Sequence, residues 1–194
     1  MSDPAPIHEH ALSNLRYIRE AMERASSFTS IPGWGGVGIG LTALGAAALA
    51  HPVAGTRRWL LIWLAEAVVA AVIALVAMIR KASRANVSFR GVASRRFFSS
   101  YFAPLVAGAV LTYVLGHAGH FELLAPTWLL LYGVSFISSG AFSIPVVPVM
   151  GICYMVLGVA AAFVPPGAGN VLMAAGFGGL HIIFGSMIAR RYGG

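Results

Sequence analysis

The sequence predicts an all-α, polytopic membrane protein with six transmembrane helices and an N-terminal amphipathic helix in the cytoplasm. Three observations predict this fold class. Of the 194 residues, 58% are hydrophobic and 10% are charged, whereas a soluble domain has about 25% charged residues. Long apolar stretches fill most of the chain, and almost all of the charged residues lie between them. Basic residues are concentrated in alternate connections, as in proteins that cross a bilayer several times.

The apolar stretches are long enough to cross a membrane, because a span needs about 20 mostly apolar residues for a hydrocarbon core about 30 Å thick. The expected spans are about 33–51, 58–80, 99–119, 123–142, 145–163 and 170–189. The chain is thus expected to consist of a cytoplasmic helix, a six-helix bundle and a cytoplasmic tail, over residues 1–31, 32–190 and 191–194. Residues 1–31 contain no apolar run, so we do not expect an ordinary cleaved secretory signal there.

The net charge of +7 is explained by membrane topology. With a cytoplasmic N-terminus, eleven of the thirteen Lys and Arg residues face the cytoplasm, as the positive-inside rule requires. We therefore expect a bacterial cytoplasmic membrane protein with both termini in the cytoplasm. The basic loop expected at 81–98 should attract anionic membrane lipids, at about 1 kcal/mol per basic residue. Nucleic acid is not an expected partner, because no recognisable binding module accompanies the charge.

Residues 8–30 are predicted to form the amphipathic helix. Charged residues on its polar face pair at i,i+4, and apolar residues recur on the other face at 4-3-4-3 spacing. The apolar residues are Ala11, Leu15, Ile18, Met22 and Ala25. Two interpretations remain open. The helix either lies on the membrane surface or on the cytoplasmic loops, or it binds a soluble regulatory partner or a second copy of the chain.

Small residues on three spans indicate close helix packing. Helices in lipid gain little from hydrophobicity against one another, so small residues that allow close backbone approach favour their association. They are Gly36, Gly40, Ala43 and Ala47 in the first span, Gly151 and Gly158 in the fifth, and Gly178 and Gly185 in the sixth. We expect packing grooves here and not ligand-binding loops. An inverted repeat of three spans in each half of the chain remains an open alternative.

Glu66 is the residue that most strongly indicates a function. It lies eight residues beyond Arg58, hence about 12 Å inside the apolar core. An ionisable group at that depth costs a few kcal/mol unless it is paired, neutral or hydrated. Glu66 is therefore expected either to mark a cavity, a proton path or a ligand counter-ion, or to be a protonated side chain that hydrogen-bonds to a neighbouring helix.

Further polar residues lie inside the spans. His181 shares a helix face with Gly178 and Gly185, and its partner is expected to be Glu66, a backbone carbonyl or a serine of the span 123–142. One face of that span carries Trp128, Tyr132, Ser135 and Ser139, and this polar face should point into the bundle. The candidate ligand-binding or proton-carrying residues are therefore Glu66, His181, Tyr132, Ser135, Ser139 and Trp63.

Histidines near the expected outer ends of the spans form a weak candidate for a metal site. Three imidazoles and a carboxylate at one depth could bind zinc or copper, and the residues are His51, His117, His120 and Glu122. Their spacing is generic and no cysteine joins them, so we expect no metal and no other cofactor. The sequence also contains no Ser-His-Asp set and no paired intramembrane aspartates, so an enzyme is not expected.

Two stretches carry a resemblance: LRYIREAMERASSFTSIPGWGG at 15–36 and AAGFGGLHIIFGSMIARRYGG at 174–194. Together with Trp63, Leu64, Ala65 and Glu66, they resemble an uncharacterised bacterial group of small multi-span membrane proteins. Such proteins often look like neighbours of small winged-helix regulators, so the resemblance implies a sensing or regulatory role. It implies no catalytic residue.

The leading functional hypothesis is a non-enzymatic membrane sensor or accessory protein. It would bind a lipid or a small apolar ligand inside the bundle and signal through its N-terminal helix. The alternative is a small proton-coupled transporter that uses Glu66, which a water-filled cavity reaching this residue would favour. A metal-binding protein at the outer face is the third hypothesis.

Overall fold

The computed structural model describes residues 11–18, 28–84 and 91–193, and these residues are almost entirely helical. Residues 11–18 form a short exposed helix. The longer helices are α2 (Gly33–Ala50), α3 (Arg57–Arg84), α4 (Val92–Ala118), α5 (Leu124–Gly140), α6 (Val146–Ala161), α7 (Pro166–Met173) and α8 (His181–Tyr192). A π-helical segment, Ala174–Leu180, joins α7 to α8 in one continuous helical stretch.

Five helical stretches are long and apolar enough to cross a membrane: Gly33–Val53, Arg57–Arg84, Val92–Ala118, Phe121–Gly140 and Pro166–Tyr192. Helices suit such a chain because every backbone polar group must be satisfied without water inside a bilayer. The prediction of a multi-pass helical membrane protein is thereby confirmed. The fifth expected span, 145–163, corresponds to α6, which is apolar but only 16 residues long.

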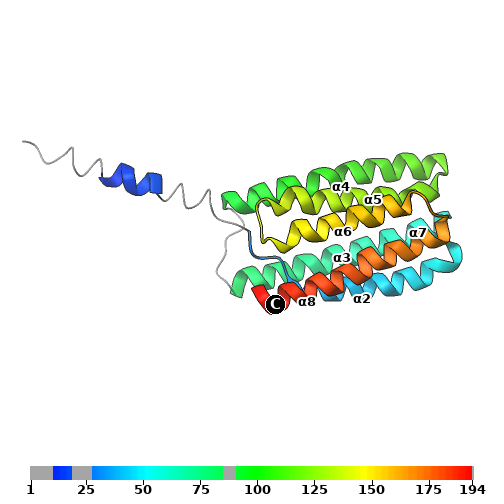
Figure 1. Ribbon diagram of the computed structural model, residues 1–194, viewed down its shortest axis with the longest axis horizontal. Helices are drawn as coiled ribbons and strands as arrows, with labels where there is room; N and C mark the ends of the chain where they lie inside the picture. Colours follow the sequence, from blue (N-terminus) through cyan, green and yellow to red (C-terminus); the bar gives the residue numbers. More distant parts are fainter. Residues whose placement is uncertain (1–10, 19–27, 85–90, 194) are drawn as a thin grey trace, which may run out of the picture.

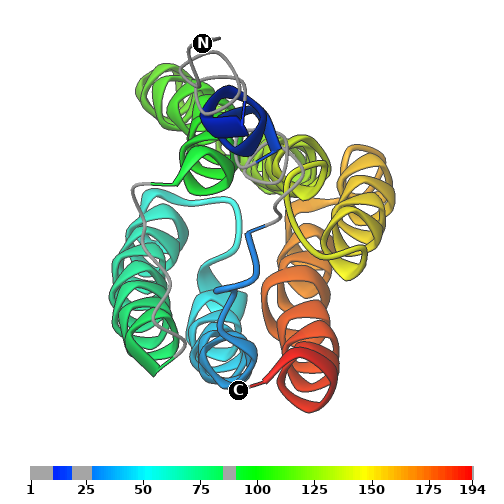
Figure 2. The same ribbon diagram turned by 90° about the vertical axis from the view of Figure 1, so that its left-hand side faces the viewer.

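The helices form two layers of three (Figures 1 and 2). In one layer α2 packs between α3 and α8, and in the other α5 packs between α4 and α6. The first two long helices therefore share a layer with the last. The layers are not the N-terminal and C-terminal halves of the chain, because α4 packs with α5 and α6 whereas α8 packs with α2.

Glycines allow the closest helix contacts within each layer. A Cβ atom added at Gly40 would lie 2.6 Å from the carbonyl oxygen of Gly178 in the π-helical segment and 3.0 Å from the amide nitrogen of Ile182 in α8, so the backbones approach closely here. In the other layer, a Cβ atom at Gly151 would lie 2.7 Å from the carbonyl oxygen of Gly133. The prediction that these spans pack through grooves of small residues is confirmed, because small residues are what lets helix backbones approach in lipid.

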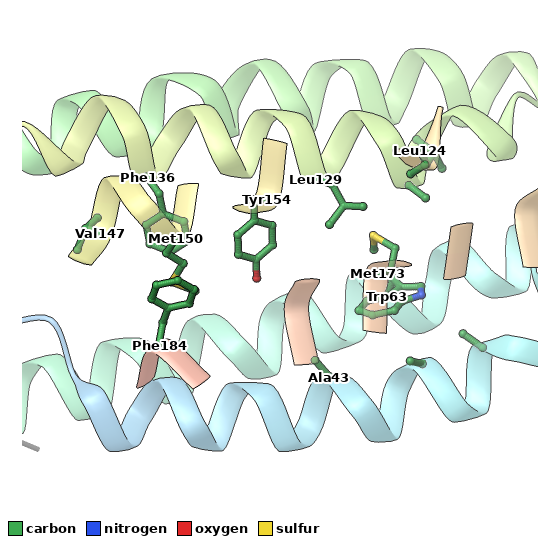
Figure 3. Packing of buried hydrophobic residues seen from close by; sticks show 14 of the residues in the cluster. Ala43, Trp63, Leu124, Leu129, Phe136, Val147, Met150, Tyr154, Met173 and Phe184 are labelled. Atoms are coloured by element: carbon green, nitrogen blue, oxygen red, sulfur yellow. The ribbon is translucent and has the colours of Figure 1, made fainter. Parts of the chain in front are cut away.

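Bulky side chains fill the space between the layers (Figure 3). Leu129 and Phe136 of α5 and Tyr154 of α6 face Trp63 and Phe184 of the opposite layer, and each of these five residues is at most 8% exposed. The layers therefore share one apolar core.

In the expected basic loop at 81–98, the described residues 81–84 and 92–98 are helical, which corrects the sequence prediction for these residues. Helix α3 continues to Arg84, and α4 begins at Val92, several residues before the predicted start of its span. The physical reason is that extending a formed helix costs little, and arginine is a good helix former in an exposed turn. Gly91 has an extended backbone and caps α4.

The segment 28–32 crosses the end of the bundle as an extended strap, whereas the sequence predicted helix through residue 30 (Figure 2). The Phe28 amide donates to the Phe142 carbonyl over 2.7 Å, and the Ser143 hydroxyl donates to the Phe28 carbonyl over 2.6 Å. Phe28 is only 2% exposed, so burial of its ring and these backbone hydrogen bonds outweigh helix propensity. The remainder of the predicted helix, apart from 11–18, lies outside the described residues.

Lys81 fixes the other end of the strap. Its ammonium donates hydrogen bonds to the carbonyls of Ile31, Tyr192 and Gly193 over 2.9, 3.0 and 2.6 Å. A cation is favourable at the C-terminus of a helix, where carbonyl groups lack intrahelical partners. The start of α2, the end of α3 and the end of α8 therefore lie together, and the strap connects them to the α4–α6 layer.

Candidate functional site

A cleft of about 1450 Å³ lies between α3 and α4 and reaches the core between the layers. This volume exceeds the roughly 300–1,000 Å³ of ordinary small-molecule pockets. Along α3 the cleft extends from Arg57 to Ile79, which is roughly 33 Å at the rise of an α-helix. Its walls are mostly apolar, and α3 and α4 themselves bury few of their residues. The cleft is thus long, apolar and open at the side of the bundle.

The cleft exists because α3 and α4 belong to different layers. They approach each other near one end, where a Cβ atom at Gly116 would lie 3.3 Å from a methyl carbon of Leu60. At the end with the strap, the two helices stand apart (Figure 2). The cleft is therefore shaped as a wedge, with Ile31, Pro32 and Phe98 on its wall near the wide end.

Glu66 lies on the wall of this cleft and is 9% exposed. Its Oε1 atom is 2.8 Å from the hydroxyl oxygen of Thr42 on α2. Among the described residues, the Oε2 atom has no hydrogen-bond partner, and Ser30 Oγ is the only fully enclosed polar side-chain atom there that lacks one. Oε2 is therefore open to the cleft.

His181 lies on the cleft wall opposite α3 and is held by two tyrosines. Its Nδ1 atom is 2.7 Å from the Tyr154 hydroxyl, and its Nε2 atom is 3.2 Å from the Tyr132 hydroxyl. The Tyr154 hydroxyl also donates to the carbonyl of Gly176, in the π-helical segment, over 2.7 Å. Its single proton is used there, so His181 Nδ1 carries a proton and donates to Tyr154. In the neutral imidazole, Nε2 then accepts from Tyr132.

Aromatic rings line the cleft between Glu66 and His181. The centroid of Phe177 lies 6.0 Å from that of Trp63 and 5.0 Å from that of Tyr132, and the Tyr132 centroid lies 6.2 Å from that of Tyr101. All four rings face the cleft. A ligand near Glu66 would therefore meet aromatic surface and few other polar groups.

A buried amide holds the tryptophans of α3. The side-chain oxygen of Asn170 accepts hydrogen bonds from the indole nitrogens of Trp59 and Trp63 over 2.8 and 3.1 Å. Its amide nitrogen donates to the carbonyl of Ala47 over 3.0 Å. Asn170 is 2% exposed, so it joins α2, α3 and α7 behind the cleft and fixes the ring of Trp63 in the wall.

Four of the six candidate residues predicted from the sequence lie on the cleft wall. They are Glu66, His181, Tyr132 and Trp63. Ser135 and Ser139 are fully buried and donate to carbonyls of their own helix, so they point into the bundle as predicted but do not line the cleft. Glu66 and His181 have other partners and do not pair with each other.

The weak metal candidates do not come together. His120 Nδ1 lies 3.1 Å from a carboxylate oxygen of Glu122 at the surface, and the ring of His117 stacks on Tyr113. In the part of the chain that the structure describes, no group of three or more His, Cys, Asp or Glu side chains is placed to hold a metal ion.

Sequence reasoning missed Thr42, Tyr154 and Asn170. Each is conspicuous in hindsight, since Thr42 is the only hydroxyl residue within 33–51 and Tyr154 the only one within 145–163. Asn170 is the only Asn in the expected sixth span. Polar side chains that are rare inside apolar helices usually face a partner helix.

Comparison of the chain with protein-family models, curated proteins and solved structures gave no match. The functional argument therefore rests on the cleft and its residues.

Proposed function

We propose that this protein binds a membrane lipid or another small apolar ligand in the cleft between α3 and α4. The observation that carries the proposal is the cleft itself, whose walls are apolar over roughly 33 Å and whose side is open between two helices. Ligand sites are typically apolar cavities with a few well-placed polar groups. Glu66, Tyr132 and His181 are such groups.

Blocking the cleft should remove the bound ligand. Ala70 lies on the cleft wall and Ala65, on the same helix, is exposed outside it. Lipid that copurifies with the wild-type protein can be quantified by native mass spectrometry in a mild detergent. We expect Ala70→Trp to lower the bound lipid severalfold because the indole fills the cleft, and Ala65→Trp to leave it unchanged. Equal lipid retention in both variants would contradict the proposal.

The proposal includes six membrane crossings, with α6 as the short one. Lys81 binds carbonyls on both the segment before α2 and the end of α8, so α2 begins and α8 ends on the same side of the bundle. An even number of crossings is required for this, and α6 supplies the sixth. The positive-inside rule places this side, with its basic residues, in the cytoplasm.

Cysteine labelling tests this topology. In a Cys153→Ser background, an impermeant thiol reagent applied to intact cells should label Ala118→Cys, at the exposed end of α4, but not Arg191→Cys at the end of α8. The physical reason is that the two residues lie on opposite sides of the bilayer in the proposed topology. After cell lysis both should react. Labelling of Arg191→Cys in intact cells would contradict the proposed orientation.

We further infer that occupancy of the cleft is reported through the N-terminal helix. The strap after this helix bonds to the α4–α6 layer at Phe28 and to Lys81 of α3 at Ile31. It therefore spans the wide end of the wedge. In the described part of the helix, Leu12, Leu15 and Ile18 are more than half exposed, which supports docking to a membrane surface or a regulatory partner.

A proton-coupled transporter is the second candidate function. This function is favoured by the position of Glu66 on the cleft wall, where its Oε2 atom has no hydrogen-bond partner among the described residues. Intramembrane carboxylic acids of this kind commonly carry protons in transporters.

A further inference from the structure

We propose that the ligand of this cleft is a lipophilic amine, whose ammonium group binds the carboxylate of Glu66 in exchange for the Glu66 proton. This inference rests on the proposed ligand-binding function and specifies the chemical class of the ligand. It follows from the hydrogen-bonding needs of Glu66, the rings beside it and the absence of a nearby cation among the described residues.

The Thr42 hydroxyl can serve both protonation states of Glu66. Its oxygen lies 2.8 Å from Glu66 Oε1 and 2.9 Å from the carbonyl oxygen of Ile39. When Glu66 is ionised, Thr42 donates its one proton to the carboxylate. When Glu66 is protonated, its O–H donates to Thr42, which donates to the Ile39 carbonyl. The carboxyl group can therefore gain or lose a proton without losing its partner.

No described residue neutralises an ionised Glu66, which takes part in no ion pair there. The titratable and charged groups that face the cleft are Arg57, Tyr101, Tyr113, His117, Tyr132 and His181. Arg57 lies nine residues earlier on the same helix, about 13 Å away along its axis. His181 is held by its two tyrosines. In an apolar setting an isolated carboxylate is costly, so the empty site favours the protonated form.

A ligand that pairs with the Oε2 atom must supply a hydrogen-bond donor. A cationic donor forms the strongest hydrogen bond with a carboxylate. A hydrogen bond between an ammonium and a carboxylate is roughly twice as strong as a neutral one. Trp63 lies three residues before Glu66, on the same side of α3, and its ring together with Tyr132 and Phe177 offers the faces that attract cations. An anionic head group would find no such partner near Glu66.

The exchange balances in charge and atoms. The O–H bond of Glu66 breaks, its proton leaves to the aqueous phase, and the ammonium ion takes the place of that positive charge beside the carboxylate. The apolar chain of the ligand occupies the remaining cleft, between α3 and α4. Binding of one cation therefore releases one proton, and the net charge of the bundle stays constant.

The test uses the full chain in detergent and dodecyl chains that carry a terminal bromine and differ only in their head group. The head groups are a primary ammonium, a hydroxyl and a carboxylate. Bromine quenches nearby tryptophans, and Trp63 and Trp128 line the cleft. The ammonium chain should bind about tenfold more tightly than the hydroxyl chain, and the carboxylate chain should bind most weakly. A pH indicator in weak buffer should report a proton released with each ammonium bound.

Two matched variants complete the experiment. Glu66→Gln keeps the shape and hydrogen-bonding reach of the side chain but has no proton to exchange, so the ammonium preference and the proton release should both disappear. Glu122→Gln makes the same change at a surface residue outside the cleft and should behave as the wild type. Equal affinities of the ammonium and hydroxyl chains for the wild type, or ammonium binding without proton release, would overturn the inference.

The outcomes separate this inference from the proposed function. If the hydroxyl chain binds as tightly as the ammonium chain, and Ala70→Trp removes this binding, the cleft is a ligand site but its ligand is not an amine. If no chain binds the wild type, both the ligand class and the proposed function are wrong.

Discussion

Replacing Asn170 with leucine is expected to destabilise the folded bundle by about 3 kcal/mol, since three buried hydrogen bonds are lost at about 1 kcal/mol each. The indole nitrogens of Trp59 and Trp63 and the carbonyl of Ala47 would all lose their partner. Leucine has the same number of side-chain heavy atoms and the same branch at Cγ, so the substitution leaves no cavity and the lost hydrogen bonds cause the effect. Thermal unfolding in one detergent, followed by intrinsic fluorescence, measures it.

The control for this prediction is Asn170→Asp. A protonated aspartic acid still accepts from both indoles and can donate to the Ala47 carbonyl, so its loss of stability should be clearly smaller than that of Asn170→Leu. Wild-type stability in Asn170→Leu would show that the indole hydrogen bonds do not hold α3 against α7.

Two glycine-to-alanine changes in the same helix should differ in their effect on stability, and only one of them should destabilise the bundle. At Gly40 the new Cβ atom would lie 2.6 Å from the backbone oxygen of Gly178 and 3.0 Å from the amide nitrogen of Ile182 in α8, so α2 must move away from the π-helical segment and α8. Such overpacking typically costs about 1–3 kcal/mol. At Gly45 no atom lies within 4 Å of the new Cβ, and alanine favours a helix by about 1 kcal/mol over glycine.

We therefore expect Gly40→Ala to lower the melting temperature and Gly45→Ala to leave it unchanged or raise it. Both variants carry the same chemical change in one helix, so their difference isolates the contact with α8. Equal melting temperatures in the two variants would mean that α2 and α8 do not touch at Gly40.

The sequence was sufficient to predict an all-helical chain with several apolar helices long enough to span a membrane, and some residues of the cleft, because those features are local. A carboxylate within an apolar stretch is visible at Glu66 without knowing any neighbour. The i,i+3 spacing that puts Tyr132 on the face of Ser135 also requires only helix geometry. The small residues of α2 indicated a packing face for the same reason.

The rest of the site depends on which helices meet. Trp59 and Asn170 are far apart in the chain and come together only because α7 continues into α8 beside α2. The cleft forms because α3 and α4 diverge into separate layers, and both helices are apolar around most of their surface, so periodicity marks no inner face. The extended strap at Phe28 likewise depends on partners at Phe142 and Ser143, a hundred residues later along the chain.

The grouping of the helices also sets the order in which the two layers can be completed during synthesis. The layer of α4, α5 and α6 consists of consecutive helices and is complete as soon as the third has been made. The other layer begins with α2 and α3 but is completed only by α8, which is synthesised after all three helices of the first layer. Until α8 is made, the face of α2 that carries Gly36 and Gly40 lacks the helix that packs against it, so the nascent bundle stays incomplete until α8 joins it.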